Sequence, residues 1–272
     1  MRAARLVWIL ASVAKLHATG DIPQLVEKVR SGTTRAKEGA AGALVILAVN
    51  ADNRVAIAAA GGIAPLVELA RSGTARAKEG AAGALGILAI NDDNKVAIAA
   101  AGGIAPLIEL TRSGTDDAKK EAAGALWNLA SDNADNQVAI AAAGGIAPLV
   151  ELARSGTARA KEEAAAALAI LAIGNADNRM AVVAAGGIAP LVELTRSGTD
   201  GAKEKAAGAL RNLALNADNQ VAIAAAGGIA PLVELTRSGT ARAKERAARA
   251  LRVLAGNADN RREMDRLGYQ SS

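Results

Sequence analysis

Residues 55–69 read VAIAAAGGIAPLVEL, and the same fifteen residues recur unchanged at 138–152 and 221–235. Two further copies, at 96–110 and 180–194, differ at one position and at a few positions. The prolines of these five copies, Pro65, Pro106, Pro148, Pro190 and Pro231, follow one another at intervals of 41 or 42 residues. A fixed period of this length excludes ankyrin and tetratricopeptide arrays and is typical of the longer helical repeats.

The punctuation of one copy divides it into three predicted helices. A short helix, capped by Asp52 or Asn53, stops at a pair of glycines. A second helix begins near Pro65, which is tolerated in a first turn, and stops at the next glycine. Thr74 is placed to cap a third and longest helix, which ends at Asn91. No segment has the pattern of a strand, so the sequence predicts an all-α fold.

The framework GGI.PLVEL…SG…KE.AAGAL.NLA resembles the armadillo repeat family over nearly the whole chain. The resemblance implies a right-handed α-solenoid, or superhelix, with three helices per repeat. We expect a single domain over residues 1–272, with an N-terminal cap helix at 1–21, six repeats at 22–259 and a partial seventh repeat as C-terminal cap at 260–272. The copies are alike enough to indicate recent duplication or a consensus-derived design.

The first residues leave two interpretations open. Two arginines precede a short apolar run, which is a feature of signal peptides. The apolar residues also recur at helical spacing and continue the repeat pattern, so we favour a cap helix that includes Trp8 and His17. No apolar run approaches the length that spans a bilayer. We therefore expect a soluble protein of the cytoplasm or the nucleus.

The composition excludes most catalytic chemistry. The chain has no cysteine, one histidine and three aromatic residues, which removes disulfides, thiolate nucleophiles, histidine-rich metal sites and base-stacking platforms. The net charge of +5 is mild for this length. We expect no enzymatic activity, no cofactor and no metal.

The differences between near-identical copies predict where function lies. They concentrate at four positions of the third helix, and we call the set of equivalent residues at one position, one from each copy, a column. The second, third and fourth positions lie 3, 6 and 7 residues after the first, and this spacing places all four on one helical face. The candidate groove residues are Val45, Ile46, Ile87, Glu121, Gly124, Trp127, Asn128, Glu163, Ile170, Lys205, Arg211, Asn212, Arg246, Arg249 and Arg252. The glycines of these columns indicate close approach, and we favour packing between helices over contact with a ligand.

The chemistry of the columns changes along the chain. The first two copies offer apolar residues and glycine, the middle two add Glu121 and Glu163, and repeats five and six are basic. The resemblance implies that the third helices line a concave groove, in which an Asn near the helix end binds the main chain of an extended peptide. That motif matches only at Asn128 and Asn212. We expect an extended peptide or protein partner with acidic residues facing repeats five and six.

Two other hypotheses stay open. The chain could be a consensus or designed scaffold with no native ligand, or its basic copies could bind nucleic acid, which the scarcity of aromatic residues disfavours. We expect a monomer or a weak homodimer. The recurring glutamates are interpreted as a solvated structural row, and the Asn-Ala-Asp-Asn loops as helix caps. The glutamates of that row are Glu68, Glu109, Glu151, Glu193 and Glu234.

Overall fold

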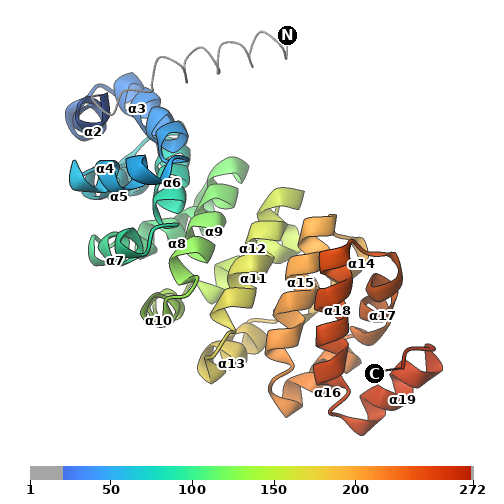
Figure 1. Cartoon of the computed structure of the whole chain (residues 1–272). Coiled ribbons are helices and arrows are strands. Elements are labelled where there is room, and N and C mark those ends of the chain that lie inside the picture. The colour runs from blue at the N-terminus through green and yellow to red at the C-terminus, as the bar shows by residue number, and fades with distance from the viewer. Residues whose placement is uncertain (1–20, 271–272) are drawn as a thin grey trace, which may run out of the picture. The chain divides into compact units, whose positions relative to one another are not determined.

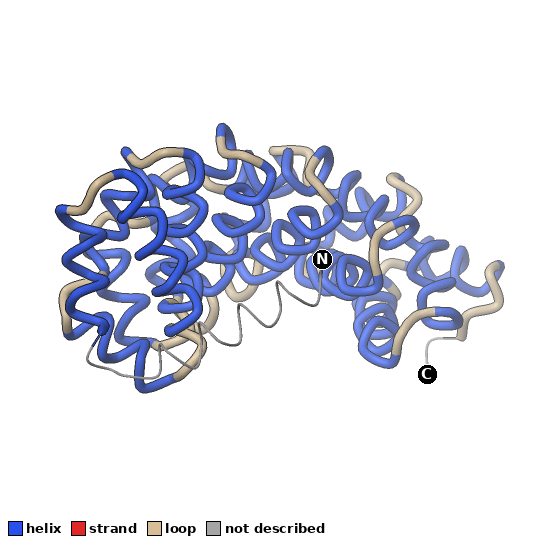
Figure 2. Tube along the Cα trace, turned by 90° about the horizontal axis from the view of Figure 1, so that it is seen from above, coloured by secondary structure: helices blue, strands red, loops and turns tan. Residues whose placement is uncertain are grey.

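A computed structural model describes residues 21–270, and over these residues its regular structure is helical (Figure 2). The first helices of the repeats are α4 (Ala51–Ala59), α7 (Asp92–Ala100), α10 (Ala134–Ala142), α13 (Ala176–Ala184), α16 (Ala217–Ala225) and α19 (Ala258–Arg266). The second are α2 (Ile22–Ser31), α5 (Ile63–Ser72), α8 (Ile104–Ser113), α11 (Ile146–Ser155), α14 (Ile188–Ser197) and α17 (Ile229–Ser238). The third are α3 (Thr34–Leu47), α6 (Ala75–Leu88), α9 (Asp116–Ala130), α12 (Ala158–Leu171), α15 (Asp200–Leu213) and α18 (Ala241–Leu254). The all-α prediction and the three helices per repeat are confirmed. The expected cap helix at 1–21, with Trp8 and His17, lies outside the described residues, except for residue 21.

Side chains at the helix starts explain why the elements begin where they do. The Thr74 Oγ1 accepts a hydrogen bond from the Ala77 amide at 3.2 Å, so the predicted cap of the third helix is confirmed. The prediction that Asp52 or Asn53 caps the first helix is wrong, because Asn50 does so. Its Oδ1 accepts from the amides of Asp52 and Asn53, at 2.8 and 3.2 Å.

The third helix ends earlier than predicted. It stops at Leu88, and Asn91 instead caps the next first helix, accepting from the Asn94 amide at 3.0 Å. The two loops that carry the extra residue of the 42-residue copies each contain a left-handed residue, Asp132 with φ of 54° and Gly174 with φ of 66°. Gly adopts this conformation without strain and Asp tolerates it better than most residues, so the loop absorbs the added residue.

The chain divides into two compact units, Met1–Leu129 and Ala130–Ser272. In the first, α3 packs against α6, and the second helices α2, α5 and α8 stack in sequence. In the second, α12, α15 and α18 pack side by side, and each is backed by its own second helix, α11, α14 or α17 (Figure 1). Both cores use the same leucine in every third helix, at 0–1% exposure. These leucines are Leu44, Leu85, Leu126, Leu168, Leu210 and Leu251.

The end of the second unit departs from the repeat. The helix α19 stands where the first helix of another copy would begin, with the charged sequence ADNRREMDR. The Arg237 Nη2 donates a hydrogen bond to the Leu267 carbonyl at 2.6 Å, which ties α17 to the end of α19. Among residues 21–270 no single helix is long and apolar enough to cross a membrane; five pairs of consecutive helices pass that test only together, and each pair is bent by 81–84°.

Candidate functional site

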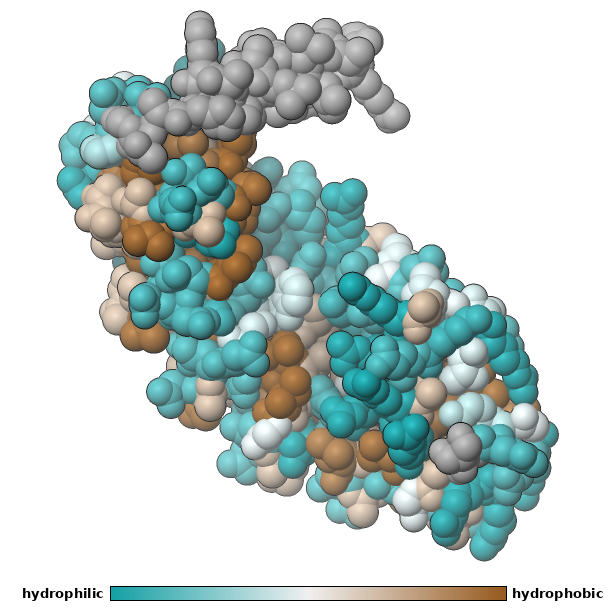
Figure 3. Space-filling model, viewed as in Figure 1, coloured by the Kyte–Doolittle hydropathy of each residue, from teal (hydrophilic) through white to brown (hydrophobic). Residues whose placement is uncertain are grey.

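The candidate residues of the first unit lie at its surface. Ile46 is 38% exposed, and the other first-unit candidates, Val45, Ile87, Glu121, Gly124, Trp127 and Asn128, are half-buried. They come from the same face of α3, α6 and α9, as the column spacing predicts. Hydrophobic residues reach the surface over α3 and α6 (Figure 3). This face therefore combines accessible apolar area with one indole and one amide.

Acidic side chains gather on the same face of the first unit. The Glu121 Oε1 lies 2.7 Å from the Lys120 Nζ, and its Oε2 lies 3.4 Å from the place that a Cβ on Gly83 would take. Burial raises the pKa of the Glu79 carboxyl, and the carboxylates of Asp117 and Glu121 raise it further. The side chain of Glu121 thus lies across α6, and the ammonium of Lys120 beside it offsets its charge.

The candidate residues of the second unit are mostly basic. Arg246, Arg249 and Arg252 are exposed on α18, and Lys205 and Arg211 are half-buried on α15. Strongly hydrophilic residues cover the surface around α18 (Figure 3). Glu163 and Ile170 on α12 are half-buried. The Arg249 Nη2 lies 2.5 Å from the Oε1 of Glu245, which precedes it by four residues on the same helix.

The two candidate asparagines bond to neighbouring repeats. The Nδ2 of Asn128 donates to the Gly86 carbonyl at 2.8 Å, and the Nδ2 of Asn212 donates to the Ala169 carbonyl, also at 2.8 Å. Asn212 is only 5% exposed. Each amide thus joins its third helix to the preceding one. That these amides bind the main chain of a partner stays a prediction, and it now has to compete with a bond inside the protein.

The glycines on this face fall into two classes. A Cβ on Gly86 would lie 3.3 Å from Ala125, and one on Gly80 would lie 3.1 Å from the Cβ of Ala41. A Cβ on Gly42 would meet no described residue within 4 Å, and one on Gly208 would meet only the Arg246 side chain, at 3.9 Å. The packing interpretation is therefore confirmed at Gly80 and Gly86, whereas Gly208 is covered by the side chain of Arg246 alone and Gly42 by no described residue.

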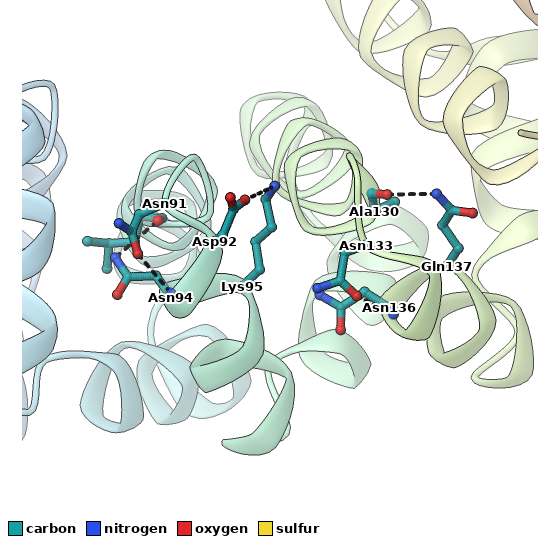
Figure 4. A network of polar contacts seen from close by, with 9 residues as sticks. Asn91, Asp92, Asn94, Lys95, Ala130, Asn133, Asn136 and Gln137 are labelled. Carbon is teal, nitrogen blue, oxygen red and sulfur yellow. Dashed lines mark hydrogen bonds and ion pairs between the residues drawn. The ribbon is translucent and has the colours of Figure 1, made fainter.

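Sequence reasoning missed a set of polar contacts at the junctions between repeats. In α4, α7, α13, α16 and α19, the Asn of the first turn donates through Nδ2 to a carbonyl near the end of the preceding third helix, as Asn94 does to Leu88 at 3.1 Å. The residue after it often reaches the same end, as the Gln137 Nε2 does to the Ala130 carbonyl at 3.0 Å (Figure 4). In the first unit, Lys95 instead pairs with Asp92 at 2.7 Å (Figure 4). The recurring Asp-Asn pair was the signal, because a helix end needs donors for its last carbonyls.

The row of glutamates on the second helices has the structural role expected of it. Glu68, Glu109, Glu151 and Glu193 are exposed, and each lies near the arginine three residues later on its own helix. A hydrogen bond from the Ser197 hydroxyl lowers the pKa of Glu193. Within residues 21–270, no group of three or more His, Cys, Asp or Glu side chains is placed to hold a metal ion.

Comparisons with known proteins agree with this architecture. The family model for the armadillo/beta-catenin-like repeat matches residues 50–90, 91–131, 133–173, 175–215 and 216–256. No curated protein sequence matches the chain significantly.

Solved structures give a closer likeness. The chain is similar to the crystal structure of an engineered protein, with 36% identity, coverage of 87% of this chain and 97% of that one, and a TM-score of 0.82. It is similar to computationally designed armadillo repeat proteins for modular peptide recognition, with 25% identity, coverage of 85% and 99%, and a TM-score of 0.78. It is also similar to a designed armadillo repeat protein in complex with the peptide (KR)4, with 26% identity, coverage of 86% and 99%, and a TM-score of 0.77.

Proposed function

The chain belongs to the armadillo/beta-catenin-like repeat family, and we propose that it is a non-enzymatic scaffold that holds an extended segment of a partner protein along the third helices. One observation carries the proposal. The copies are near-identical, yet their differences gather on one face of the third helices, and most of those residues are exposed or half-buried. Residues that serve stacking alone would be free of such differences, as the buried leucines are.

The apolar part of the proposed contact lies on the first unit. Val45, Ile46, Ile87 and Trp127 would bury side chains of the partner, and Ile170 would do so on the second unit. Aromatic anchors in such surfaces carry a large share of the binding energy, so Trp127 is the first residue to test. Similar designed armadillo proteins serve modular peptide recognition, which supports an extended peptide as the ligand.

The charged part of the proposed contact favours acidic side chains on the second unit. One similar designed protein binds the basic peptide (KR)4. Here α15 and α18 present Lys205, Arg211, Arg246, Arg249 and Arg252, so the partner residues that face these helices would carry the opposite sign. Such complementarity sets orientation and association rate more than affinity.

A second hypothesis is a designed scaffold without a native ligand. The likeness to an engineered protein and to a designed armadillo repeat protein favours it. It differs from the first hypothesis in one respect, because it expects no selective peptide. Binding of nucleic acid through the basic helices is a third hypothesis, which predicts a steep dependence of affinity on salt.

The experiment is a screen of extended octapeptides, followed by mapping of amide chemical shifts. We expect selective peptides that shift amides of the third helices and lose affinity in Trp127→Ala. The matched control is Val96→Ala, because Val96 is a 61% exposed apolar residue on a first helix. Absence of any selective peptide, or shifts confined to the first and second helices, would contradict the proposal.

A further inference from the structure

Arg211 is a half-buried cation that is held in place by an amide. Its Nη1 donates to the Oδ1 of Asn212 at 3.0 Å, and the Nδ2 of Asn212 donates to the Ala169 carbonyl at 2.8 Å. Asn212 itself is 5% exposed. In the described part of the chain, no carboxylate lies within ion-pair distance of Arg211. Two hydrogen bonds in series therefore fix the guanidinium relative to α12 and leave its charge uncompensated.

A second cation reaches the same part of α15. A Cβ on Gly208 would lie 3.9 Å from the Cδ of Arg246, so the stem of Arg246 lies against the turn that contains Gly208. Gly208 precedes Arg211 and Asn212 by three and four residues, which places all three on one helical face. Within residues 21–270, Arg246 forms no ion pair. The half-buried Arg211 and the exposed Arg246 thus approach the same turn of α15, and neither has an ion-pair partner in the described part of the chain.

We propose that Arg211 and Arg246 form a binding site for the carboxylate of an Asp or Glu side chain in the partner segment, with Asn212 as the positioning residue. This inference rests on the proposed function and assigns the ligand chemistry of one position within it. A guanidinium offers two parallel donors that match a carboxylate, and a half-buried cation without a counterion gains most from one.

The amide at residue 212 suits this role better than a carboxylate would. An aspartate there would also hold Arg211, but it would neutralise the charge that the ligand needs. The neutral amide fixes the side chain and keeps its charge. A side chain that is already ordered loses less conformational entropy on binding, which is the physical gain from Asn212.

The first unit supplies a matched control. Asn128 makes the same bond to the carbonyl of Gly86, at the same distance of 2.8 Å, but the residue before it is Trp127. Asn128→Leu and Asn212→Leu therefore remove equivalent bonds between repeats, and only the second releases an arginine. Comparing them separates loss of stability from loss of positioning.

The experiment measures fluorescence anisotropy of two labelled octapeptides, one alternating Glu with Ser and the other alternating Gln with Ser. At about 10 mM salt, where the Debye length is about 30 Å, electrostatic preference is readily seen. We expect the acidic peptide to bind about tenfold more tightly than the neutral one. Arg211→Leu should abolish most of that preference, and Asn212→Leu should reduce it about threefold. Asn128→Leu and Arg242→Leu should leave it unchanged, the latter as a control for net charge.

Four outcomes decide the proposal. If the preference falls equally in Asn212→Leu and Asn128→Leu, Asn212 does not position Arg211. The double variant Arg211→Leu/Asn212→Leu should be no weaker than Arg211→Leu, and additive losses would overturn the coupling. Should Asn212→Leu fail to fold, Asn212→Asp should still lose the preference. If both peptides bind equally to the parent protein, the carboxylate site is wrong while the peptide scaffold stands; binding of neither these nor any library peptide would remove the scaffold as well.

Discussion

Asn94→Ala is expected to lower the free energy of unfolding by about 2–3 kcal/mol, because the side chain makes two hydrogen bonds and is 4% exposed. Its Nδ2 donates to the Leu88 carbonyl at 3.1 Å and to the Arg54 carbonyl at 3.3 Å. Each bond contributes about 1 kcal/mol net, and a buried carbonyl left without a donor adds a penalty of similar size. The bond to Arg54 joins two repeats, so the loss includes a term for their interface.

Asn53→Ala is the matched control, because Asn53 occupies the same place in the preceding first helix. Among residues 21–270, its Nδ2 donates only to the Leu47 carbonyl, at 3.0 Å, and the side chain is half-buried. We expect a loss of about 1 kcal/mol there. Urea unfolding followed by circular dichroism gives both values, and hydrogen exchange over α4 and α7 shows whether the array opens in parts. A loss in Asn94→Ala no larger than that in Asn53→Ala would refute this account of the junction.

Three further changes test the site and the ends. Gly42→Ala should stabilise the protein by about 1 kcal/mol, because a helix gains from Ala, whereas Gly86→Ala should gain less in the same urea titration, since its Cβ would crowd the next helix. Glu79→Gln should raise the melting temperature near neutral pH. The raised pKa of Glu79 means that the folded state binds the proton more tightly, so the ionised form lowers stability, and the advantage of Gln should shrink as pH falls toward 4.5, the ordinary pKa. Arg237→Ala should speed hydrogen exchange in α19, because it removes the bond to Leu267, and unchanged exchange would mean that this contact contributes little.

Local signals made most of the fold predictable from sequence. Thr74 caps its helix by accepting a hydrogen bond from the amide three residues later, and Gly61 takes a left-handed conformation, with φ of 72°, at the end of a first helix. Each depends on neighbours in the chain, so each could be predicted without knowledge of the packing. The prediction of the cap at Asp52 or Asn53 was wrong for a local reason too, because three residues that can cap a helix, Asn50, Asp52 and Asn53, lie within four positions.

The roles of the groove residues depend on the adjacent copy, which a single helix does not reveal. Gly42 and Gly83 occupy the same position in near-identical sequence, yet a Cβ on Gly42 would meet no described residue within 4 Å, while one on Gly83 would lie 3.4 Å from Val45 and from Glu121. The bonds of Asn128 and Asn212 reach carbonyls 42 and 43 residues earlier in the chain. The residue type that would bind a partner's main chain is the same one that joins two repeats, so composition alone could not separate the two uses.

The partners of these two asparagines show a rule that the sequence itself supports. Asn128 and Asn212 donate to the carbonyls of Gly86 and Ala169. These are the two smallest of the six equivalent third-helix residues, the others being Val45, Trp127, Arg211 and Arg252. Where the preceding copy has a larger residue, the asparagine is replaced by Ile or Val. The larger residues are Val45 before Ile87, Trp127 before Ile170, and Arg211 before Val253. A small side chain beside the carbonyl leaves the space through which the amide reaches it.

Ala169→Val should therefore break the bond of Asn212 without touching either Asn212 or Arg211. If Arg211 is positioned through that bond, Ala169→Val should reduce the preference for the acidic octapeptide about threefold, as Asn212→Leu does, because the guanidinium regains its freedom. Ala169→Gly is the matched control, since Gly86 already serves the same bond in the first unit, and it should keep the preference. Anisotropy measures the preference, and the NMR signals of the Asn212 side-chain amide report whether the bond is lost. Loss of the bond with the preference intact would show that Arg211 binds carboxylates, if at all, without help from its neighbour.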